Sequence, residues 1–212
     1  MMDGMEPQGI RIDGVKRVHG RATLTLSTGE QLSMPRAMLR ERPYKRGMPF
    51  DRQAFDSLIR ERSYPFALEK AIAQLASRAR TEKEIVDCLR RNAYPEITIA
   101  RVMARLHEAG YINDADFAAQ WTASRSSKGM GTRRIRMELR QKGVHPEQID
   151  QALSSVDEDE LIDGAVKAAQ KASRGKDLSS PADRQKILAA LARRGYDFSL
   201  AKKALEFLRE NE

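Results

Sequence analysis

The residues with the clearest capacity for chemistry are a run of cations in the middle of the chain. Between residues 122 and 145, seven lysines and arginines stand against one acid, Glu138, so this window has a net charge of +6. The seven are Arg125, Lys128, Arg133, Arg134, Arg136, Arg140 and Lys142. Guanidinium groups bind carboxylates and phosphates through paired hydrogen bonds, so these residues are candidate contacts to a protein partner or to DNA. A solvated helix face is the alternative interpretation of such a run.

Three of these arginines share one side of a predicted helix. Ile135 and Leu139 set the buried direction of that helix. At about 100° per residue, Arg133, Arg136 and Arg140 fall within an arc of about 60° on the opposite side. This convergence favours a binding face, but it does not distinguish an acidic protein surface from nucleic acid.

No group of residues in the sequence forms a catalytic pattern. Residues 128–133 lack the spacing and the Lys-Ser/Thr ending of a nucleotide-binding loop, and we interpret them as a turn before a helix whose amides could still meet an anion. Cys88 has no histidine at a fixed spacing and is expected to be a partly buried thiol. The acidic run 157–160 lacks the ligand pattern of a calcium loop and suits the first turn of a helix. We therefore predict no catalytic residue, no metal site, no cofactor and no enzymatic activity.

Phe117 and Trp121 lie four residues apart, which places them on one helix face. Such a pair can form part of a core or a platform for stacking nucleic-acid bases. We favour the core.

The composition is that of a cytoplasmic protein. The 212 residues are 41% hydrophobic and 32% charged, with a net charge of +8. No apolar run approaches the roughly 20 residues of a membrane span, and the start of the sequence lacks the pattern of a secretion signal. The single cysteine, Cys88, excludes an intramolecular disulfide and fits a reducing compartment.

The N-terminal part differs in kind from the rest. Residues 1–62 are predicted to form a β-hairpin-like element of two or three strands followed by a short helix at 35–42. The segments that suit strands are 10–12, 15–18, 22–26 and 31–34. So small a sheet must pack on the helical part of the chain.

A helical pattern then begins at Tyr64 and occurs three times. A set of three residues four positions apart, of which the last two are apolar, recurs after about fifty residues. The copies are Thr81-Ile85-Leu89, Gly131-Ile135-Leu139 and Asp183-Ile187-Leu191. A further helix is predicted before each copy, at 67–79, 116–126 and 160–172. We therefore predict three-helix repeats at 63–112, 113–158 and 159–212. Stacking of such units predicts a mainly α fold with an elongated, curved body.

Residues at the predicted helix ends support this division. Thr81 and Glu84 have the spacing of a capping box. Ser180-Pro181 and His145-Pro146 place a proline at the first helical position. Three glycines, Gly110, Gly143 and Gly195, follow apolar segments at the position where a left-handed residue ends a helix.

These motifs resemble the RecX family, from about Phe66 to Leu208. The central stretch LHEAGYINDADFA from Leu106 continues through Trp121 and Arg125 to Gly131, and IRMELRQKGV from Ile135 is similar to the family signature I-x-x-E-L-x-x-K-G. The other repeats fit at 75–84 and 191–198. Asn92-Ala93 departs from the usual Lys-Gly, and the first sixty residues match only loosely.

The resemblance implies a non-enzymatic regulator of the RecA recombinase in DNA repair, homologous recombination and the SOS response. It implies a body that lodges in the groove of the RecA–DNA filament and inhibits RecA's ATPase, strand exchange and filament growth. We add the expectation that the arginine face contacts acidic protein or DNA backbone. The expected partners are the RecA filament and single- or double-stranded DNA, with no membrane, and we expect a monomer.

The alternative interpretation is a transcription regulator that binds DNA directly through a helix-turn-helix-like unit. Short helices joined by glycine turns allow it. The spread of the arginines along their helix and the lack of a dimerisation zipper speak against it.

Overall fold

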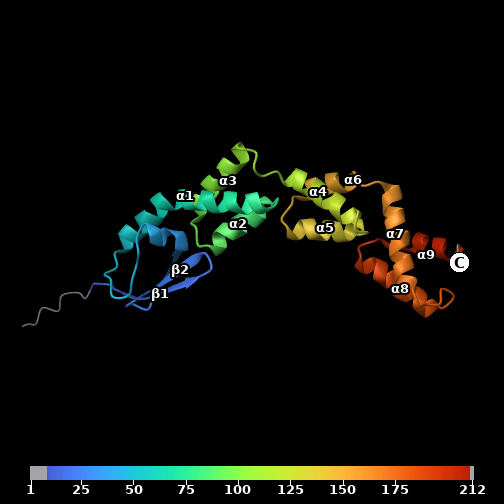
Figure 1. The fold of residues 1–212 in the computed structure, drawn as a ribbon, viewed down its shortest axis with the longest axis horizontal. Coiled ribbons are helices and arrows are strands. Elements are labelled where there is room, and N and C mark those ends of the chain that lie inside the picture. The colour runs from blue at the N-terminus through green and yellow to red at the C-terminus, as the bar shows by residue number, and fades with distance from the viewer. Residues whose placement is uncertain (1–8, 211–212) are drawn as a thin grey trace, which may run out of the picture. The chain divides into compact units, whose positions relative to one another are not determined.

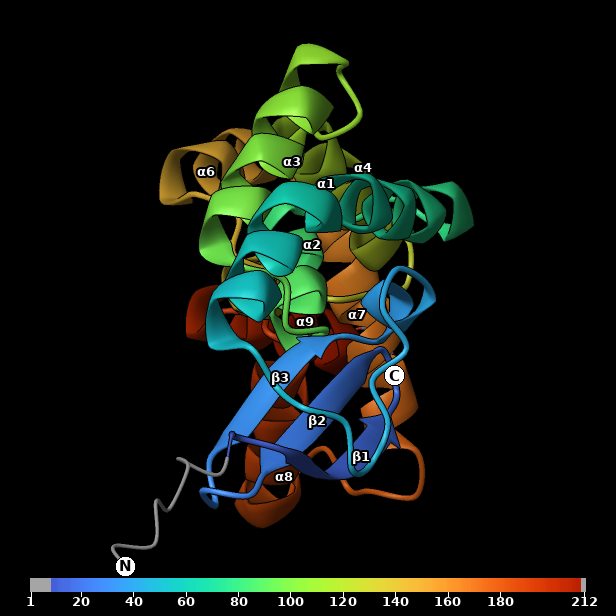
Figure 2. The same cartoon turned by 90° about the vertical axis from the view of Figure 1, so that its left-hand side faces the viewer.

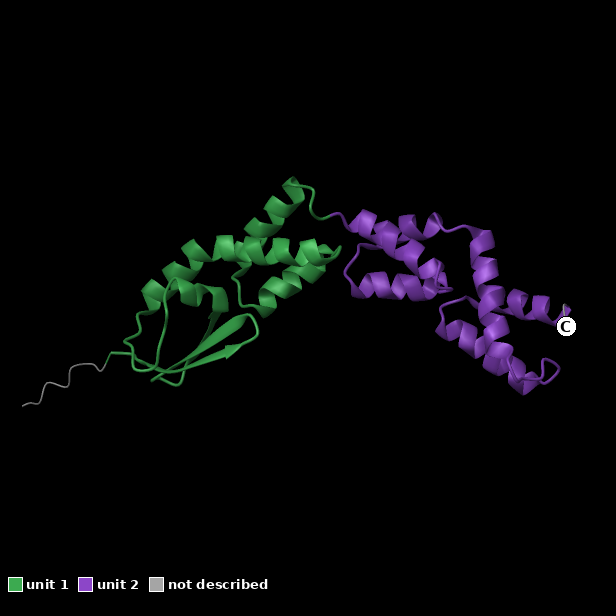
Figure 3. Cartoon of the chain, in the orientation of Figure 1, with its two compact units in different colours: residues 1–112 green, residues 113–212 purple. Residues whose placement is uncertain are grey.

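The structure is a computed structural model that describes residues 9–210, so the first eight residues of the predicted N-terminal element lie outside it, as does the start considered for a secretion signal. The described residues form three strands, a short 3₁₀ helix η1 and nine α-helices (Figure 1). In chain order these are β1 (Ile12–Val18), β2 (Arg21–Leu26), β3 (Gln31–Pro35), η1 (Arg36–Arg40), α1 (Arg52–Ser77), α2 (Glu82–Arg91), α3 (Glu96–Glu108), α4 (Asp114–Ser126), α5 (Thr132–Gln141), α6 (Pro146–Ser154), α7 (Glu158–Ser173), α8 (Pro181–Arg193) and α9 (Phe198–Glu210). The predicted mainly α fold with a small N-terminal β-element is confirmed. The chain divides into two compact units, residues 1–112 and 113–212 (Figure 3).

The N-terminal strands form one antiparallel sheet in the order β1-β2-β3 (Figure 2). Alternate residues of β2 point into a core, and Ala22, Leu24 and Leu26 are almost fully buried there. The core is completed by η1 and by the first half of α1, including Phe55. The sheet therefore packs on α1, as its size required.

Helix α1 begins earlier than predicted. Its expected start at residue 67 is wrong, because the helix runs from Arg52 to Ser77 without interruption past Pro65. Asp51 caps it by accepting a hydrogen bond from the amide of Ala54 at 3.0 Å. Proline removes one intrahelical hydrogen bond and normally disrupts a helix, but here the two halves are held by different cores, and Phe66 contacts both.

The three-fold spacing of apolar residues corresponds to three separate cores. Each repeated pair lies on the second helix of its repeat with no exposed surface: Ile85 and Leu89 on α2, Ile135 and Leu139 on α5, Ile187 and Leu191 on α8. The third helices add Ile99, Ile149 and Ala201. The sequence equivalence of the three helix triplets therefore holds in the packing.

The second helix of every repeat ends in the same way. In α5 the amide of Val144 donates to the carbonyl of Leu139, and Gly143 has φ +84°. In α8 the amide of Tyr196 likewise donates to the carbonyl of Leu191, and Gly195 has φ +90°. In α2 the left-handed residue is Ala93, with φ +60°. The helix-ending motif thus survives in the first repeat without its glycine.

Two predicted start signals have different outcomes. Thr81 and Glu84 form the capping box, in which the Thr81 hydroxyl accepts from the Glu84 amide at 3.2 Å. Ser180 is the residue before α8, but its side chain makes no capping hydrogen bond.

Candidate partner-binding surface

Helix α5 presents the predicted arginine face. Arg133, Arg136 and Arg140, together with Met137 and Gln141, line an open depression of about 500 Å³, which we name the α5 groove. Ile135 and Leu139 fix the rotation of the helix because both are fully buried on its other side. The three arginines therefore share a solvent-facing surface.

The three arginines differ in their partners. Arg136 forms an ion pair with Asp150 of α6, an acid that is 61% exposed. Among residues 9–210, Arg133 and Arg140 form no ion pair with another side chain. Two guanidinium groups of the groove are thus available to an anionic partner, and the third is shared with a carboxylate at the rim.

Two other predicted contact residues, Arg125 and Arg134, bind an acid of the same repeat. Glu138 accepts hydrogen bonds from Arg125 Nε at 2.8 Å and from Arg134 Nε at 3.0 Å. Burial by itself raises the pKa of the Glu138 carboxyl, but the hydrogen bonds from the two arginines outweigh it and hold the pKa below its ordinary value. One carboxylate thus holds both guanidinium groups, and the three side chains together keep a net charge of +1.

The aromatic pair of α4 belongs to the same network. Phe117 and Trp121 stack with ring centroids 5.6 Å apart, and Phe117 is 7% exposed. The Trp121 indole donates to Glu138 at 3.1 Å, while the Lys142 ammonium lies 4.3 Å from the centre of the indole ring. The core interpretation of this pair is confirmed, and Lys142 points toward an aromatic side chain.

Two amides at the start of α5 are occupied by carbonyl groups at the end of α8. Lys128 is exposed, but the amide of Gly131 donates to the carbonyl of Arg194 at 2.9 Å, and that of Arg133 donates to Gly195 at 3.1 Å. The start of α5 thus meets the end of α8, an arrangement in which helix dipoles attract. The amides of Gly131 and Arg133 are therefore not open to a phosphate, contrary to the expectation for this helix start.

Comparisons with known proteins agree with this architecture. Domain models of RecX match the chain three times: the first three-helix domain at residues 67–106, the second at 113–153 and the third at 158–205. The regulatory protein RecX of Mycobacteroides abscessus is 35% identical over 219 residues, which cover 95% of this chain and 91% of that protein. The chain belongs to the RecX family. Another regulatory protein RecX, from Levilactobacillus brevis, is 33% identical and matches 93% of this chain and 74% of its own length.

Solved RecX structures share the fold. The crystal structure of a regulatory protein RecX superposes with a TM-score of 0.64 over 93% of this chain and 99% of its own, at 22% identity. RecX from Lactobacillus salivarius gives the same TM-score over 69% of this chain, at 21% identity. RecX proteins are non-enzymatic regulators, and this chain is one of them.

The network around Glu138 gives a physical reason for part of the RecX motif. Glu138 is the acid of the I-x-x-E-L signature, and its donors Trp121 and Arg125 come from the adjoining motif stretch. The three side chains link α4 to α5 within the second repeat. The position equivalent to Glu138 in the first repeat is occupied by Cys88. The thiol of Cys88 was expected to be partly buried, and the structure shows that it is buried.

Other kinds of site are not formed by the described residues. Across residues 9–210, no three side chains of His, Cys, Asp or Glu gather where they could hold a metal ion. In the same range, every helix is too short or too polar to cross a membrane.

A second concentration of cations lies in the N-terminal part of the chain and was not predicted to be a binding surface. Residues 9–50 contain nine lysines and arginines against three acids, a net charge of +6 that equals that of the window 122–145. Their charges are spread over 42 positions and several strands, so no helical periodicity draws attention to them. A count of charge by predicted element would have found them.

Proposed function

We propose that this RecX protein lodges in the groove of a RecA–DNA filament and there inhibits RecA's ATPase, strand exchange and filament growth. Membership of the family supplies the expected partner. The observation that supports the contact surface is the α5 groove, in which Arg133 and Arg140 have no ion pair within the described part of the chain.

The chemistry of the α5 groove suits an extended acidic surface. It is open and shallow rather than enclosed, and its walls are arginines with an exposed methionine, Met137. Arginine forks bind carboxylates or phosphodiesters in pairs of hydrogen bonds. A partner that offers both acidic side chains and DNA phosphates therefore matches this surface better than a small substrate does.

Direct control of transcription is a weaker alternative. A helix-turn-helix protein inserts one helix into the major groove and contacts bases from its N-terminal residues. Helix α6 carries the acids Glu147 and Asp150 and no cation, and the start of α5 is covered by Arg194 and Gly195. Neither helix is suited to that role.

The proposal is tested by RecA's DNA-dependent ATPase at substoichiometric ratios of this protein. Wild type should inhibit, whereas Arg133→Glu/Arg136→Glu/Arg140→Glu should fold normally and inhibit about tenfold less, because like charges across an interface repel. A matched control, Lys171→Glu/Lys203→Glu/Arg209→Glu, makes the same charge change at exposed positions of α7 and α9.

Two outcomes would contradict the proposal. Full inhibition by the folded α5 variant would remove this surface from the mechanism. Absence of inhibition by wild type, combined with tight sequence-specific binding to duplex DNA, would favour the transcription regulator. The proposal treats the protein as a cytoplasmic monomer, and sedimentation of the free protein checks its self-association.

A further inference from the structure

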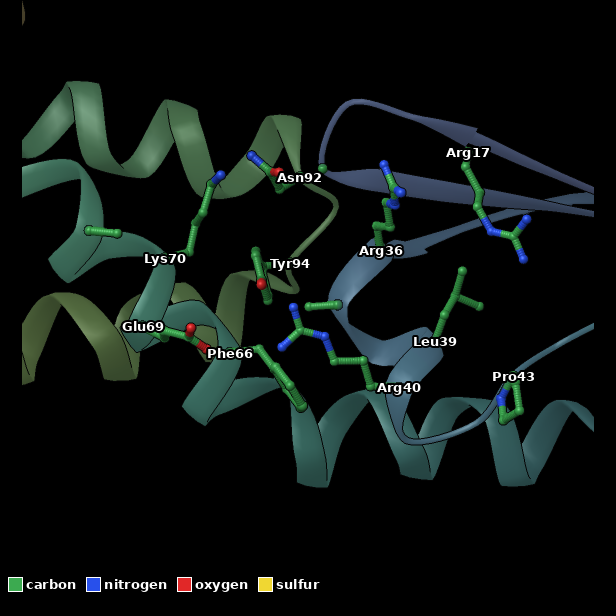
Figure 4. Close-up of a pocket in the computed structure, with 13 residues that line it drawn as sticks. Arg17, Arg36, Leu39, Arg40, Pro43, Phe66, Glu69, Lys70, Asn92 and Tyr94 are labelled. Carbon is green, nitrogen blue, oxygen red and sulfur yellow. The ribbon is translucent and has the colours of Figure 1, made fainter.

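The N-terminal sheet and the first repeat enclose a cleft that the proposed function does not use. Its volume is about 560 Å³, and we name it the N-terminal cleft. One wall comes from β1 and η1, and the other comes from α1 and the segment after α2 (Figure 4). Every lining residue belongs to the unit 1–112.

The lining of this cleft is strongly basic. Four cations face one carboxylate, that of Glu69. The cations are Arg17, Arg36, Arg40 and Lys70. Within the described chain none of the four forms an ion pair, although acids elsewhere in this unit are paired with arginines. Unpaired like charges around a concave surface repel one another, and an anion between them relieves that repulsion.

The cations approach from different elements. Arg36 and Arg40 extend from η1, and Figure 4 shows the Arg40 guanidinium directed toward Tyr94. Lys70 and Asn92 lie on the helical side of the cleft in the same view. Because the side chains come from both walls, an anion in the cleft can be contacted from two sides.

Tyr94 adds a neutral hydrogen-bond donor. Its ring is 7% exposed, and among residues 9–210 its hydroxyl makes no hydrogen bond. Burial, with a smaller contribution from the nearby Glu69, raises the pKa of the Tyr94 phenol to about 12. The hydroxyl therefore keeps its proton at neutral pH and can donate it to an anion.

The helical wall of the cleft is positioned by an unusual backbone. Ala93 adopts φ +60° between Asn92 and Tyr94. Asn92 anchors its amide on the carbonyl of Cys88 at 2.7 Å and lies so close to Gly20 that a Cβ there would be 1.3 Å from the Asn92 oxygen. The β1–β2 turn is thereby seated against the end of α2, which closes one end of the cleft.

The charge continues beyond the cleft itself. Apart from the three arginines that line the cleft, the segment 9–50 holds six cations against three acids, so the surrounding surface also attracts anions. A chain of phosphates spans such a distribution better than a single small anion does, and the volume suits one strand rather than a duplex. We propose that the N-terminal cleft binds the phosphate backbone of a single DNA strand, as a site separate from the α5 groove.

The test measures binding of a fluorescein-labelled oligothymidylate by anisotropy, without RecA. All proteins have the Arg133→Glu/Arg136→Glu/Arg140→Glu changes, so the α5 groove contributes nothing. Failure here therefore leaves the RecA proposal intact, and failure of that proposal leaves this one intact.

The cleft variant is Arg17→Gln/Arg36→Gln/Arg40→Gln, and its matched control is Lys16→Gln/Lys45→Gln/Arg46→Gln, in exposed positions outside the cleft. We expect the cleft variant to lose about tenfold or more in affinity and to reduce the salt slope by about 2, since each strand phosphate contributes about 0.7. The control should lose about twofold. Equal losses in the two variants would overturn the proposal.

Tyr94→Phe supplies a second measurement, because it retains the buried ring. Loss of a neutral donor should weaken binding about threefold without a change in salt slope. Displacement of the oligonucleotide by a polyglutamate peptide at equal charge concentration would overturn the phosphate assignment. Displacement by free ATP at concentrations where the peptide is inert would assign the cleft to a free nucleotide and overturn the DNA assignment.

Discussion

The backbones of Gly131 and Gly195 are in direct contact. A Cβ built on Gly131 would lie 2.4 Å from the carbonyl carbon and oxygen of Gly195, and the Gly131 amide donates to the adjacent Arg194 carbonyl at 2.9 Å. The second and third repeats are therefore in main-chain contact at this point. Gly164 lies nearby, where a Cβ would approach the Tyr196 hydroxyl to 2.9 Å.

Substitution of Gly131 should destabilise the C-terminal unit. In Gly131→Ala the methyl group has no room unless the backbone separates, and we expect a loss of about 2 to 3 kcal/mol in the free energy of unfolding. Denaturant unfolding followed by circular dichroism measures it. Gly14→Ala is the control, since its methyl group would meet Thr25 at an ordinary 3.9 Å. Equal stability of the two variants would show that the contact can open freely.

Ala93 gives the opposite prediction. Its left-handed backbone, with φ +60°, strains a residue that has a Cβ. Ala93→Gly should therefore raise stability by about 0.5 to 1 kcal/mol, after allowance for the greater freedom of glycine in the unfolded chain. Ala109→Gly, at the right-handed end of α3 with φ −84°, should lower it. Thermal melting of the pair is the measurement, and a destabilised Ala93→Gly would contradict the strain.

Gly143 is the residue at the end of α5 that is equivalent to Ala93, and here the left-handed position already holds a glycine. Its φ of +84° is adopted with little cost only by glycine. Gly143→Val should lower the free energy of unfolding by about 1 kcal/mol or more. An unchanged melting midpoint would mean that α5 can end in another way.

The Glu138 carboxyl should make the free energy of unfolding depend on pH in the acidic range. Its folded pKa is depressed, so its contribution is present above the unfolded pKa and lost as pH falls through the folded pKa. At neutral pH, Glu138→Gln should cost about 2 kcal/mol because charged hydrogen bonds are removed.

The difference between wild type and Glu138→Gln should then shrink on acidification below about pH 4, near the ordinary pKa of glutamate. Urea unfolding at a series of pH values measures this difference. Glu147→Gln, at an exposed position on α6, is the control and should track wild type. A difference that stays constant with pH would exclude a charge-dependent role.

Asp150 should weaken the binding of an anionic partner to the α5 groove. Its carboxylate pairs with Arg136, so Asp150→Asn should free that guanidinium and strengthen RecA inhibition about twofold to threefold. Stability should change by less than about 1 kcal/mol, since the pair is exposed. The half-inhibitory concentration in the ATPase assay is the readout, with Glu147→Gln again as the matched charge change. Weaker inhibition by Asp150→Asn would indicate that the acid itself contacts the partner.

The apolar periodicity alone was sufficient to predict the helical repeats. Ile85, Ile135 and Ile187 occur at equivalent positions, each four residues before a leucine, and in a helix this spacing places both side chains on one buried face. The same reasoning placed Arg133, Arg136 and Arg140 on one face, because rotation about a helix axis depends on local geometry only. The start of α1 was missed because residues 52–66 are anchored by the sheet core rather than by a repeat.

Which charges remain available was decided by tertiary structure. Sequence counting treats Arg125 and Arg133 alike, but packing of α4 on α5 directs the first to Glu138 and leaves the second in the groove. The N-terminal cleft likewise exists because η1, α1 and the end of α2 meet, although Arg36, Lys70 and Tyr94 are distant in the chain. Periodicity follows from torsion angles that each residue adopts locally, whereas the pairing of charges depends on contacts that close only when separate elements pack together.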